Sequence, residues 1–92
     1  MLETIDLAAL GAGESAVVET VGGADAMRRR LMDLGLIDGT RVTCLGKSPA
    51  GDPAAYLIRG AVIALRGTDA AAVTARRCLS RTFSQAPAAG AV

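Results

Sequence analysis

Alternating apolar and polar positions, bounded by glycine and proline, indicate a chain built mainly of short strands. Residues 14–21 (ESAVVETV) lie between turn signals and are rich in valine, which predicts a first strand. In residues 40–45 the alternation places Val42 and Cys44 on an inner face. The later strands are predicted at 54–58, 61–66 and 73–78, with one helical turn over 68–72.

A single amphipathic helix is predicted within ADAMRRRLMDLG, residues 24–35. Met27, Leu31 and Leu34 follow one another at i, i+4 and i+7, so they form its inner face. Asp25 is the expected N-cap, and Gly35 is the expected C′ residue that ends the helix.

The outer face of this helix is basic near its start. It carries Arg28, Arg29 and Asp33, with Arg30 near its border. These positions oppose the helix macrodipole by roughly a few tenths of a kcal/mol each, and an Arg29–Asp33 pair recovers only part of that. Helix stability therefore does not explain the arginines, which leaves open a solvated charged face or a contact with a partner or a phosphate.

Five or so strands with one helix inserted after the first predict a mainly β fold, a small and strongly bent antiparallel barrel. Upstream, the apolar positions of residues 1–13 suggest a turn or helical stub packed over one open end of the sheet. These positions are Leu2, Ile5, Leu7 and Leu10. The barrel is expected to span residues 14–78, and residues 79–92 have little to bury and are expected to form a flexible tail.

The same alternation predicts an exposed apolar pair. Because Tyr56 faces inward, its neighbour Leu57 must face outward, and Val62 does the same on the following strand. A hairpin through Arg59-Gly60 would bring these two side chains together. Either the segment around residues 2–10 covers the pair, or the pair is a docking surface for a partner or a second copy, with Arg59 at its rim.

Composition limits the chemistry that the chain can perform. Its 92 residues suit one domain, and its aromatic residues are Tyr56 and Phe83, so the core must be aliphatic. No apolar run reaches the roughly eighteen residues of a membrane helix, and acidic residues near Met1 do not suit a signal peptide, which favours a cytoplasmic protein. With no histidine, no metal site is expected, and Cys44 and Cys78 are interpreted as a core residue and a strand-end residue.

Gly46-Lys47-Ser48 matches the end of a phosphate-binding P-loop. The motif also needs a glycine five positions before Gly46, where this chain has Arg41, and a helix starting at the lysine, where Pro49 follows closely. The segment is therefore interpreted as a polar turn between strands, and no nucleotide or other cofactor is expected. Without a histidine or an assembled nucleophile and base, no enzyme activity is expected either.

Spaced glycines, prolines and arginines give the chain a resemblance to a known family. The stretch RRLMDLGLIDGTRVTCLGKSPAGDPAAYLIRGAVIALRGTDAAAV resembles the ferrous iron transport protein A (FeoA) family. That family runs approximately R-L-x-x-L-G-L-x-P-G-x-x-V-x-V, P-x-G-D-P and R-G-x-x-x-A-L-R. The matching residues are Arg30-Leu31, Leu34-Gly35-Leu36, Gly39, Val42, Pro49, Gly51-Asp52-Pro53, Arg59-Gly60 and Ala64-Leu65-Arg66. Asp38 and Cys44 depart from the usual proline and valine.

The resemblance implies an SH3-like barrel that is not an enzyme and that works in the cytoplasm. Its implied partner is FeoB, the large membrane GTPase transporter of bacterial ferrous iron uptake. Outward strand positions of the family are usually polar or charged, whereas this chain has leucine and valine there. The candidate partner-contact residues are Leu57, Val62, Arg59, Arg28 and Arg29.

Two other function classes stay open. The same barrel occurs at the C-terminal end of iron-dependent repressors, so the chain could be a regulatory module of such a repressor, although 92 residues leave no room for a helix-turn-helix. A small nucleic-acid-binding barrel is the other alternative. It would need a basic face and stacking aromatics, which a net charge of +1 and one barrel tyrosine do not favour.

Overall fold

The structure, a computed structural model, describes residues 3–78. The elements follow one another as β1 (Glu3–Asp6), the 3-10 helix η1 (Leu7–Ala9), β2 (Ser15–Val21), α1 (Asp25–Asp33), β3 (Arg41–Lys47), β4 (Ala54–Ile58), β5 (Ala61–Leu65), α2 (Gly67–Ala71) and β6 (Val73–Arg77). All strand pairs are antiparallel, which confirms the mainly β fold expected from the alternation.

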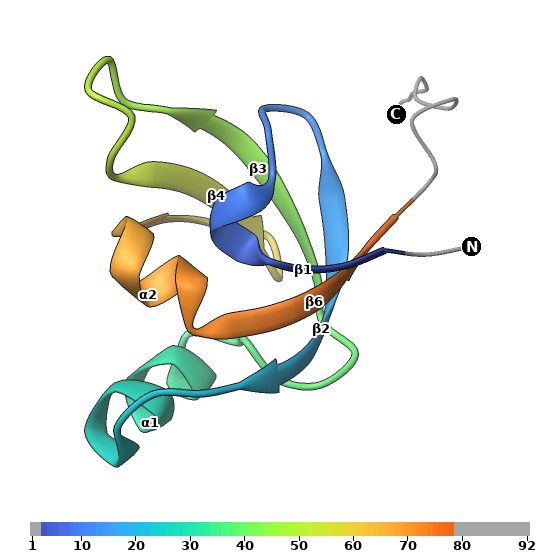
Figure 1. Cartoon of the computed structure of the whole chain (residues 1–92), viewed down its shortest axis with the longest axis vertical. Helices are drawn as coiled ribbons and strands as arrows, with labels where there is room; N and C mark the ends of the chain where they lie inside the picture. Colours follow the sequence, from blue (N-terminus) through green and yellow to red (C-terminus); the bar gives the residue numbers. More distant parts are fainter. Residues whose placement is uncertain (1–2, 79–92) are drawn as a thin grey trace.

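The six strands form one sheet in the order β1-β6-β2-β3-β4-β5. Figure 1 shows the sheet curling around the core, with β1 and β6 side by side and α1 at one end. Two register shifts assist the bending, one in β2 between Val18 and Thr20 and one in β3 between Cys44 and Gly46. β1 and β5 are the two edge strands.

The N-terminal segment contains the expected helical turn, as the 3-10 helix η1 at Leu7–Ala9, but its preceding residues Glu3–Asp6 form a strand that the sequence analysis did not expect. Glu3 pairs with Arg77 at the border of the sheet, and the Arg77 guanidinium donates from Nε to the Glu3 carboxylate at 3.0 Å. Leu7 and Leu10 follow and are fully buried. The described part of this segment, residues 3–10, therefore contributes to the sheet and the core and does not cover the exposed Leu57, whereas Leu2 lies outside the described residues.

The expected N-cap of helix α1, Asp25, was wrong. Ala24 occupies the N-cap position in an extended conformation, and no side chain caps the helix. Asp25 lies inside the first turn, where its negative charge suits the macrodipole, and it accepts a hydrogen bond from Arg28 at 3.3 Å. No ion pair joins Arg29 to Asp33 in the described part of the chain.

The C-terminal end of α1 is a Schellman motif, with Gly35 as the expected C′ residue. Gly35 has φ +106°, and its N–H donates to the carbonyl of Met32 at 2.9 Å. The N–H of Leu36 donates to the carbonyl of Leu31 at 3.1 Å. Leu31 and Leu36 are both fully buried, so the motif fastens the helix to the core through the apolar contact that usually accompanies it.

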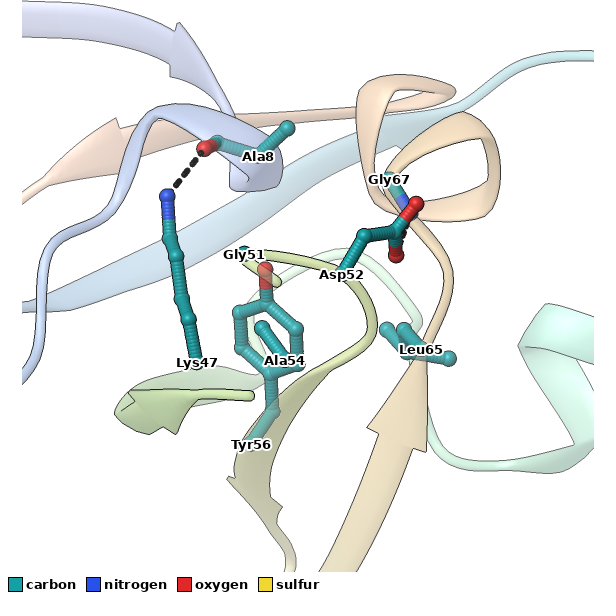
Figure 2. A pocket seen from close by; sticks show the side chains of 8 residues that line it. All are labelled: Ala8, Lys47, Gly51, Asp52, Ala54, Tyr56, Leu65 and Gly67. Carbon is teal, nitrogen blue, oxygen red and sulfur yellow. Dashed lines mark hydrogen bonds between the residues drawn. The ribbon is translucent and has the colours of Figure 1, made fainter. Parts of the chain in front are cut away.

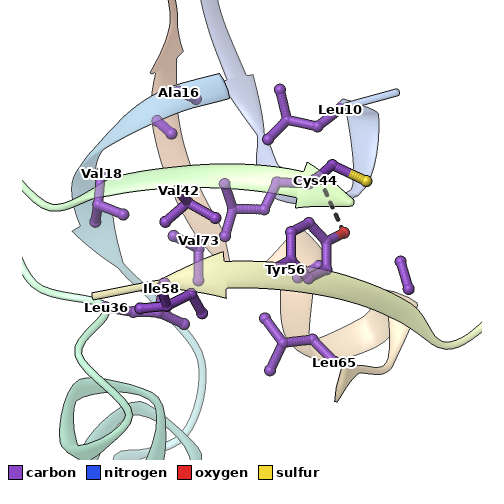
Figure 3. Packing of buried hydrophobic residues seen from close by; sticks show 14 of the residues in the cluster. Leu10, Ala16, Val18, Leu36, Val42, Cys44, Tyr56, Ile58, Leu65 and Val73 are labelled. Carbon is purple, nitrogen blue, oxygen red and sulfur yellow. Dashed lines mark hydrogen bonds between the residues drawn. The ribbon is translucent and has the colours of Figure 1, made fainter. Parts of the chain in front are cut away.

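The core is aliphatic around one tyrosine (Figure 3). Tyr56 is almost fully buried, and its hydroxyl donates to the carbonyl of Leu7 at 3.3 Å, which ties β4 to η1. Burial raises the pKa of Tyr56 to about 12. Cys44 is also buried in this core, as expected, and Cys78 directly follows β6.

The two short helices close one end of the curled sheet. α2 packs against η1, and the two lie together in Figure 1. Asp69 of α2 accepts a hydrogen bond from Arg30 of α1 at 2.9 Å, and its carboxylate is largely buried. This ion pair gives Arg30 a structural role that helix propensity does not explain, because it joins two helices that are distant in the sequence.

Candidate docking face

An exposed apolar surface covers the outer side of β3, β4 and β5. Leu57 and Val62 are directly opposite each other in the β4–β5 register, and Ala55 is opposite Ala64. The side chains of Leu57 and Val62 are 38% and 67% exposed. The alternation argument therefore placed both residues correctly. We call this surface the outer face, defined by Leu45, Ala55, Leu57, Val62 and Ala64.

Leu45 is a member of the outer face that the sequence reasoning missed. It lies at the β3 register shift between Cys44 and Gly46 and is 46% exposed. Together with Ala55 and Ala64 it lines a shallow hollow of about 360 Å³ beside the loop that joins β3 to β4. The signal for it was weak, because a shift of register changes which positions of a strand point outward.

Arg59 occupies the tight turn between β4 and β5. Ile58 pairs with Ala61, so the turn has two residues, Arg59 at φ +52° and Gly60 at φ +84°. Positive φ at both positions defines a type I′ turn, which matches the twist of a hairpin. Glycine accepts this conformation without strain, whereas arginine seldom adopts it. Arg59 must therefore be held in place by its surroundings.

The side chain of Arg59 runs back over the end of α1. Its Cδ lies 2.7 Å, and its Cγ 3.3 Å, from the position that a Cβ on Gly35 would occupy. The aliphatic part of the side chain thus lies against the C-terminal end of α1. Arg59 adjoins the outer face through the β4–β5 turn, and part of its side chain packs within the chain.

The arginines of α1 form a separate surface. Arg28 and Arg29 line a hollow of about 260 Å³ together with Asp25, Met32 and Asp33. Met32 is 42% exposed, so the lining of this hollow combines one exposed apolar side chain with charges of both signs. The five predicted site residues therefore fall into two groups. Leu57, Val62 and Arg59 belong to one hairpin, and the two α1 arginines lie elsewhere.

A third hollow, also of about 260 Å³, opens between η1, α2 and the loop after β3 (Figure 2). Its polar groups serve the fold. The N–H of Gly67 donates to Asp52 Oδ1 at 2.8 Å, at the start of α2, and Lys47 Nζ donates to the carbonyl of Ala8 at 3.5 Å. The hydroxyl of Tyr56, which also lines the hollow, already donates to the carbonyl of Leu7. These contacts close the end of the barrel and leave little polar chemistry for a ligand.

Gly46 and Lys47, which matched the end of a P-loop, are the last residues of β3. The chain continues through a loop with a cis peptide between Asp52 and Pro53 into β4, so no helix starts at Lys47. Residues 3–78 contain no group of three or more cysteine and carboxylate side chains that could hold a metal ion. No helix within the same range is long and apolar enough to cross a membrane.

Comparison with known proteins places these features in a family. A family model described as the FeoA domain matches residues 5–77. A fusion protein of Porphyromonas gingivalis, named Fe(2+) transport protein A/Fe(2+) transporter FeoB, is 33% identical over 67 residues, which is 73% of this chain. This chain spans only 8% of the length of that relative.

Solved structures share the architecture. The FeoA-like protein of Clostridium acetobutylicum has a TM-score of 0.79 at 28% identity, covering 94% of this chain and 100% of that one. The FeoA of Stenotrophomonas maltophilia in complex with zinc, described as a prokaryotic SH3 domain protein, has a TM-score of 0.70 at 35% identity, covering 77% of this chain and 88% of that one.

The fold extends beyond these relatives. A manganese-dependent transcriptional repressor has a TM-score of 0.74 at 21% identity, with 82% of this chain and 41% of the repressor covered. At that identity the likeness concerns the fold alone. The expected SH3-like barrel is thus confirmed by its resemblance to solved structures.

Proposed function

Because the chain belongs to the FeoA family, we propose that it is an accessory protein of ferrous iron uptake that docks on the cytoplasmic part of an FeoB-type membrane GTPase transporter. The observation that supports this most directly is the Porphyromonas gingivalis relative, in which an FeoA part and an FeoB part belong to one polypeptide. Domains fused in one protein commonly act together when they occur as separate chains.

The outer face is the surface that we propose for this contact. Leu57 and Val62 form an apolar pair on it, and Arg59 lies at its rim. Burying a large aliphatic side chain contributes roughly 1.5–3 kcal/mol before the costs of association. A face with few such side chains therefore suits a weak, regulated contact better than a permanent one. Arg28 and Arg29 are proposed as a secondary charged contact.

The proposed role is that of a binding module in the cytoplasm, and any nucleotide chemistry belongs to the transporter. Two of the chain's carboxylates are used in the fold: Asp69 pairs with Arg30, and Asp52 accepts from Gly67. Self-association through the outer face is a second possible use of the same surface. The two uses are mutually exclusive for any one molecule, so dimers would compete with the transporter.

The direct test uses the cytoplasmic part of the FeoB-type transporter from the same organism, purified separately. Immobilised on a biosensor surface, it should bind this chain reversibly and saturably, with an affinity in the micromolar range typical of small regulatory interfaces. An unrelated SH3-like domain is the control for non-specific binding to the immobilised fragment. Absence of binding at concentrations up to a few hundred micromolar would reject the proposed function.

A module that acts with an iron-dependent repressor is the alternative function that the sequence left open. Within residues 3–78 the α-helices are α1 and the short α2, and three strands separate them, so this part contains no helix-turn-helix. Such a module would have to act on a separate repressor chain. Capture of a purified iron-dependent repressor, with no capture of the transporter, would favour this alternative.

A further inference from the structure

The edge strand β5 presents unpaired backbone groups to the outside. Ile58 and Ala61 close a two-residue hairpin, and the closing pair of such a hairpin is hydrogen-bonded in both directions. Because the pattern alternates, Ile63 also bonds to β4, whereas the N–H and C=O groups of Val62 and Ala64 point away from it. Within residues 3–78 these outward groups have no hydrogen-bond partner.

The two edge strands, β1 and β5, differ in how well they are protected from pairing with a further strand. β1 carries Glu3 and Asp6, and charged side chains are a common device that keeps other strands from pairing with an edge. β5 has the sequence AVIAL, without charge or proline, and it pairs with β4 in continuous register. An uncharged, apolar and exposed edge is a template for an added strand.

The charges around β5 indicate what kind of strand would fit. Arg59 precedes the strand and Arg66 follows it, both exposed, and neither makes an ion pair within the described residues. If β5 paired with β5 of a second copy through Val62 and Ala64, each Arg66 would come close to an Arg59 of the other copy. This like-charge arrangement opposes self-pairing and favours an acidic partner.

We propose that β5 is a strand-addition site, which binds an extended segment of a partner protein with an apolar centre and acidic residues at both ends. The main chain of the segment would pair with Val62 and Ala64, and its acidic ends would meet Arg59 and Arg66. Alternate side chains of the segment would lie on the outer face beside Val62 and Ala64. The proposal rests on the proposed function only in taking the partner to be a protein.

Amide hydrogen exchange measured by NMR tests the site without the transporter. The probe is an acetylated and amidated peptide, Asp-Glu-Thr-Val-Thr-Val-Thr-Glu-Asp. In the free chain the amides of Val62 and Ala64 should exchange fast, whereas that of Ile63 should be protected. Saturation with the peptide should slow exchange at Val62 and Ala64 by at least tenfold. Lack of binding, or binding that leaves these two amides fast, would overturn the proposal.

Two further comparisons separate backbone pairing from side-chain docking. Ala64→Pro removes an outward N–H and should reduce peptide affinity at least tenfold, whereas Ala64→Ser keeps the N–H and should bind like the parent chain. If Ala64→Pro does not fold, the exchange rates of Val62 and Ala64 in the parent chain decide whether the peptide pairs with the backbone of β5. Arg66→Glu should weaken the acidic peptide about two- to fivefold and favour a version with lysines in place of its acidic residues.

Two other outcomes have a distinct meaning. One assigns the β5 edge to a second copy of this chain, and the other rejects the proposed function but keeps the strand-addition site. Protection of Val62 and Ala64 that rises with protein concentration, without peptide, would assign the edge to a second copy and overturn the proposal. Peptide binding with the expected protection, combined with no binding to the transporter, would support the strand-addition site and reject the proposed function alone.

Discussion

The side chain of Arg59 packs directly on Gly35, so that its Cδ lies 2.7 Å from where a Cβ of residue 35 would be. Both residues have positive φ, one in the β4–β5 turn and the other at the end of α1. The contact explains why the chain has glycine at a position where any side chain would collide with Arg59. It also fastens the helix to the hairpin that carries the outer face.

Gly35→Ala should therefore destabilise the fold for two reasons, its left-handed backbone and the collision with Arg59. We expect a loss of about 2–4 kcal/mol in the free energy of unfolding measured with urea. Gly39→Ala is the matched control, because Gly39 has φ +90° but no atom within 4 Å of its Cβ position. In an Arg59→Ala background the loss at Gly35 should fall toward that at Gly39, although Ile58 Cγ2, at 3.3 Å from the same Cβ position, keeps part of the crowding. An equal loss with and without Arg59 would contradict the contact.

Leu31→Ala should cost about 2–5 kcal/mol, because Leu31 is fully buried and belongs to the Schellman motif that joins α1 to the core. The neighbouring Met32→Ala should change stability by less than about 1 kcal/mol, since Met32 is exposed. Thermal unfolding followed by circular dichroism compares the two variants. Similar losses would show that α1 does not pack through Leu31.

The raised pKa of Tyr56 predicts a loss of stability in alkaline solution. A tyrosine in an unfolded chain ionises near pH 10, whereas Tyr56 in the fold ionises at about 12. The contribution of the protonated Tyr56 side chain to the free energy of unfolding is therefore complete below pH 10. This contribution is lost as the pH rises toward 12. Urea titrations across this window should show a steep fall in the free energy of unfolding. Tyr56→Phe should be less stable at neutral pH, because it leaves the Leu7 carbonyl without its donor, but its decline should be shallower.

Asp52 should stabilise α2 through its hydrogen bond from the N–H of Gly67. Asp52→Ala removes the acceptor and should lower the free energy of unfolding by about 0.5–2 kcal/mol. Asp52→Asn keeps a side-chain oxygen in the same place and should stay close to the parent chain. If the asparagine variant loses as much as the alanine variant, the carboxylate charge is more important than the hydrogen bond.

Leu57→Glu combined with Val62→Lys should leave the fold intact and abolish binding to the transporter fragment. Both side chains are exposed and lie opposite each other, so the new charges can pair across the strands. Ile37→Lys is the control, because it places a charge on another exposed apolar residue, between α1 and β3, that belongs neither to the outer face nor to the hollow lined by Arg28 and Arg29. Unchanged affinity of the folded double variant would exclude the outer face as the docking surface.

Local patterns were sufficient for β4, β5 and the inner face of α1. Strand β4 has the predicted bounds, and Leu57 alternates with buried Tyr56 and Ile58 as expected. The reason is physical: in a two-residue hairpin the neighbouring strand is also the partner strand, so burial and register both follow from nearby residues. The outward positions of Leu57 and Val62 were predictable for the same reason.

Features that depend on distant partners were not predictable. β1 is short and acidic, and it becomes a strand because it pairs with β6 at the other end of the sequence, with Glu3 opposite Arg77. The Arg30–Asp69 ion pair and the contact of Arg59 with Gly35 likewise join separate elements. Leu45 was missed because the register shift in β3 interrupts the alternation.

The pairing of β1 with β6 makes the chain enter and leave the sheet on adjacent strands, while β5 is the last strand in the opposite direction. The two ends of the described range thus lie beside the same pair of strands, because Glu3 is opposite Arg77. In a fusion such as the Porphyromonas gingivalis relative, a short flexible linker can hold two domains at an effective concentration in the millimolar range. Even a contact with a millimolar Kd would then be formed for much of the time. Tethered and free versions of this domain could thus use the same small apolar face at very different intrinsic affinities.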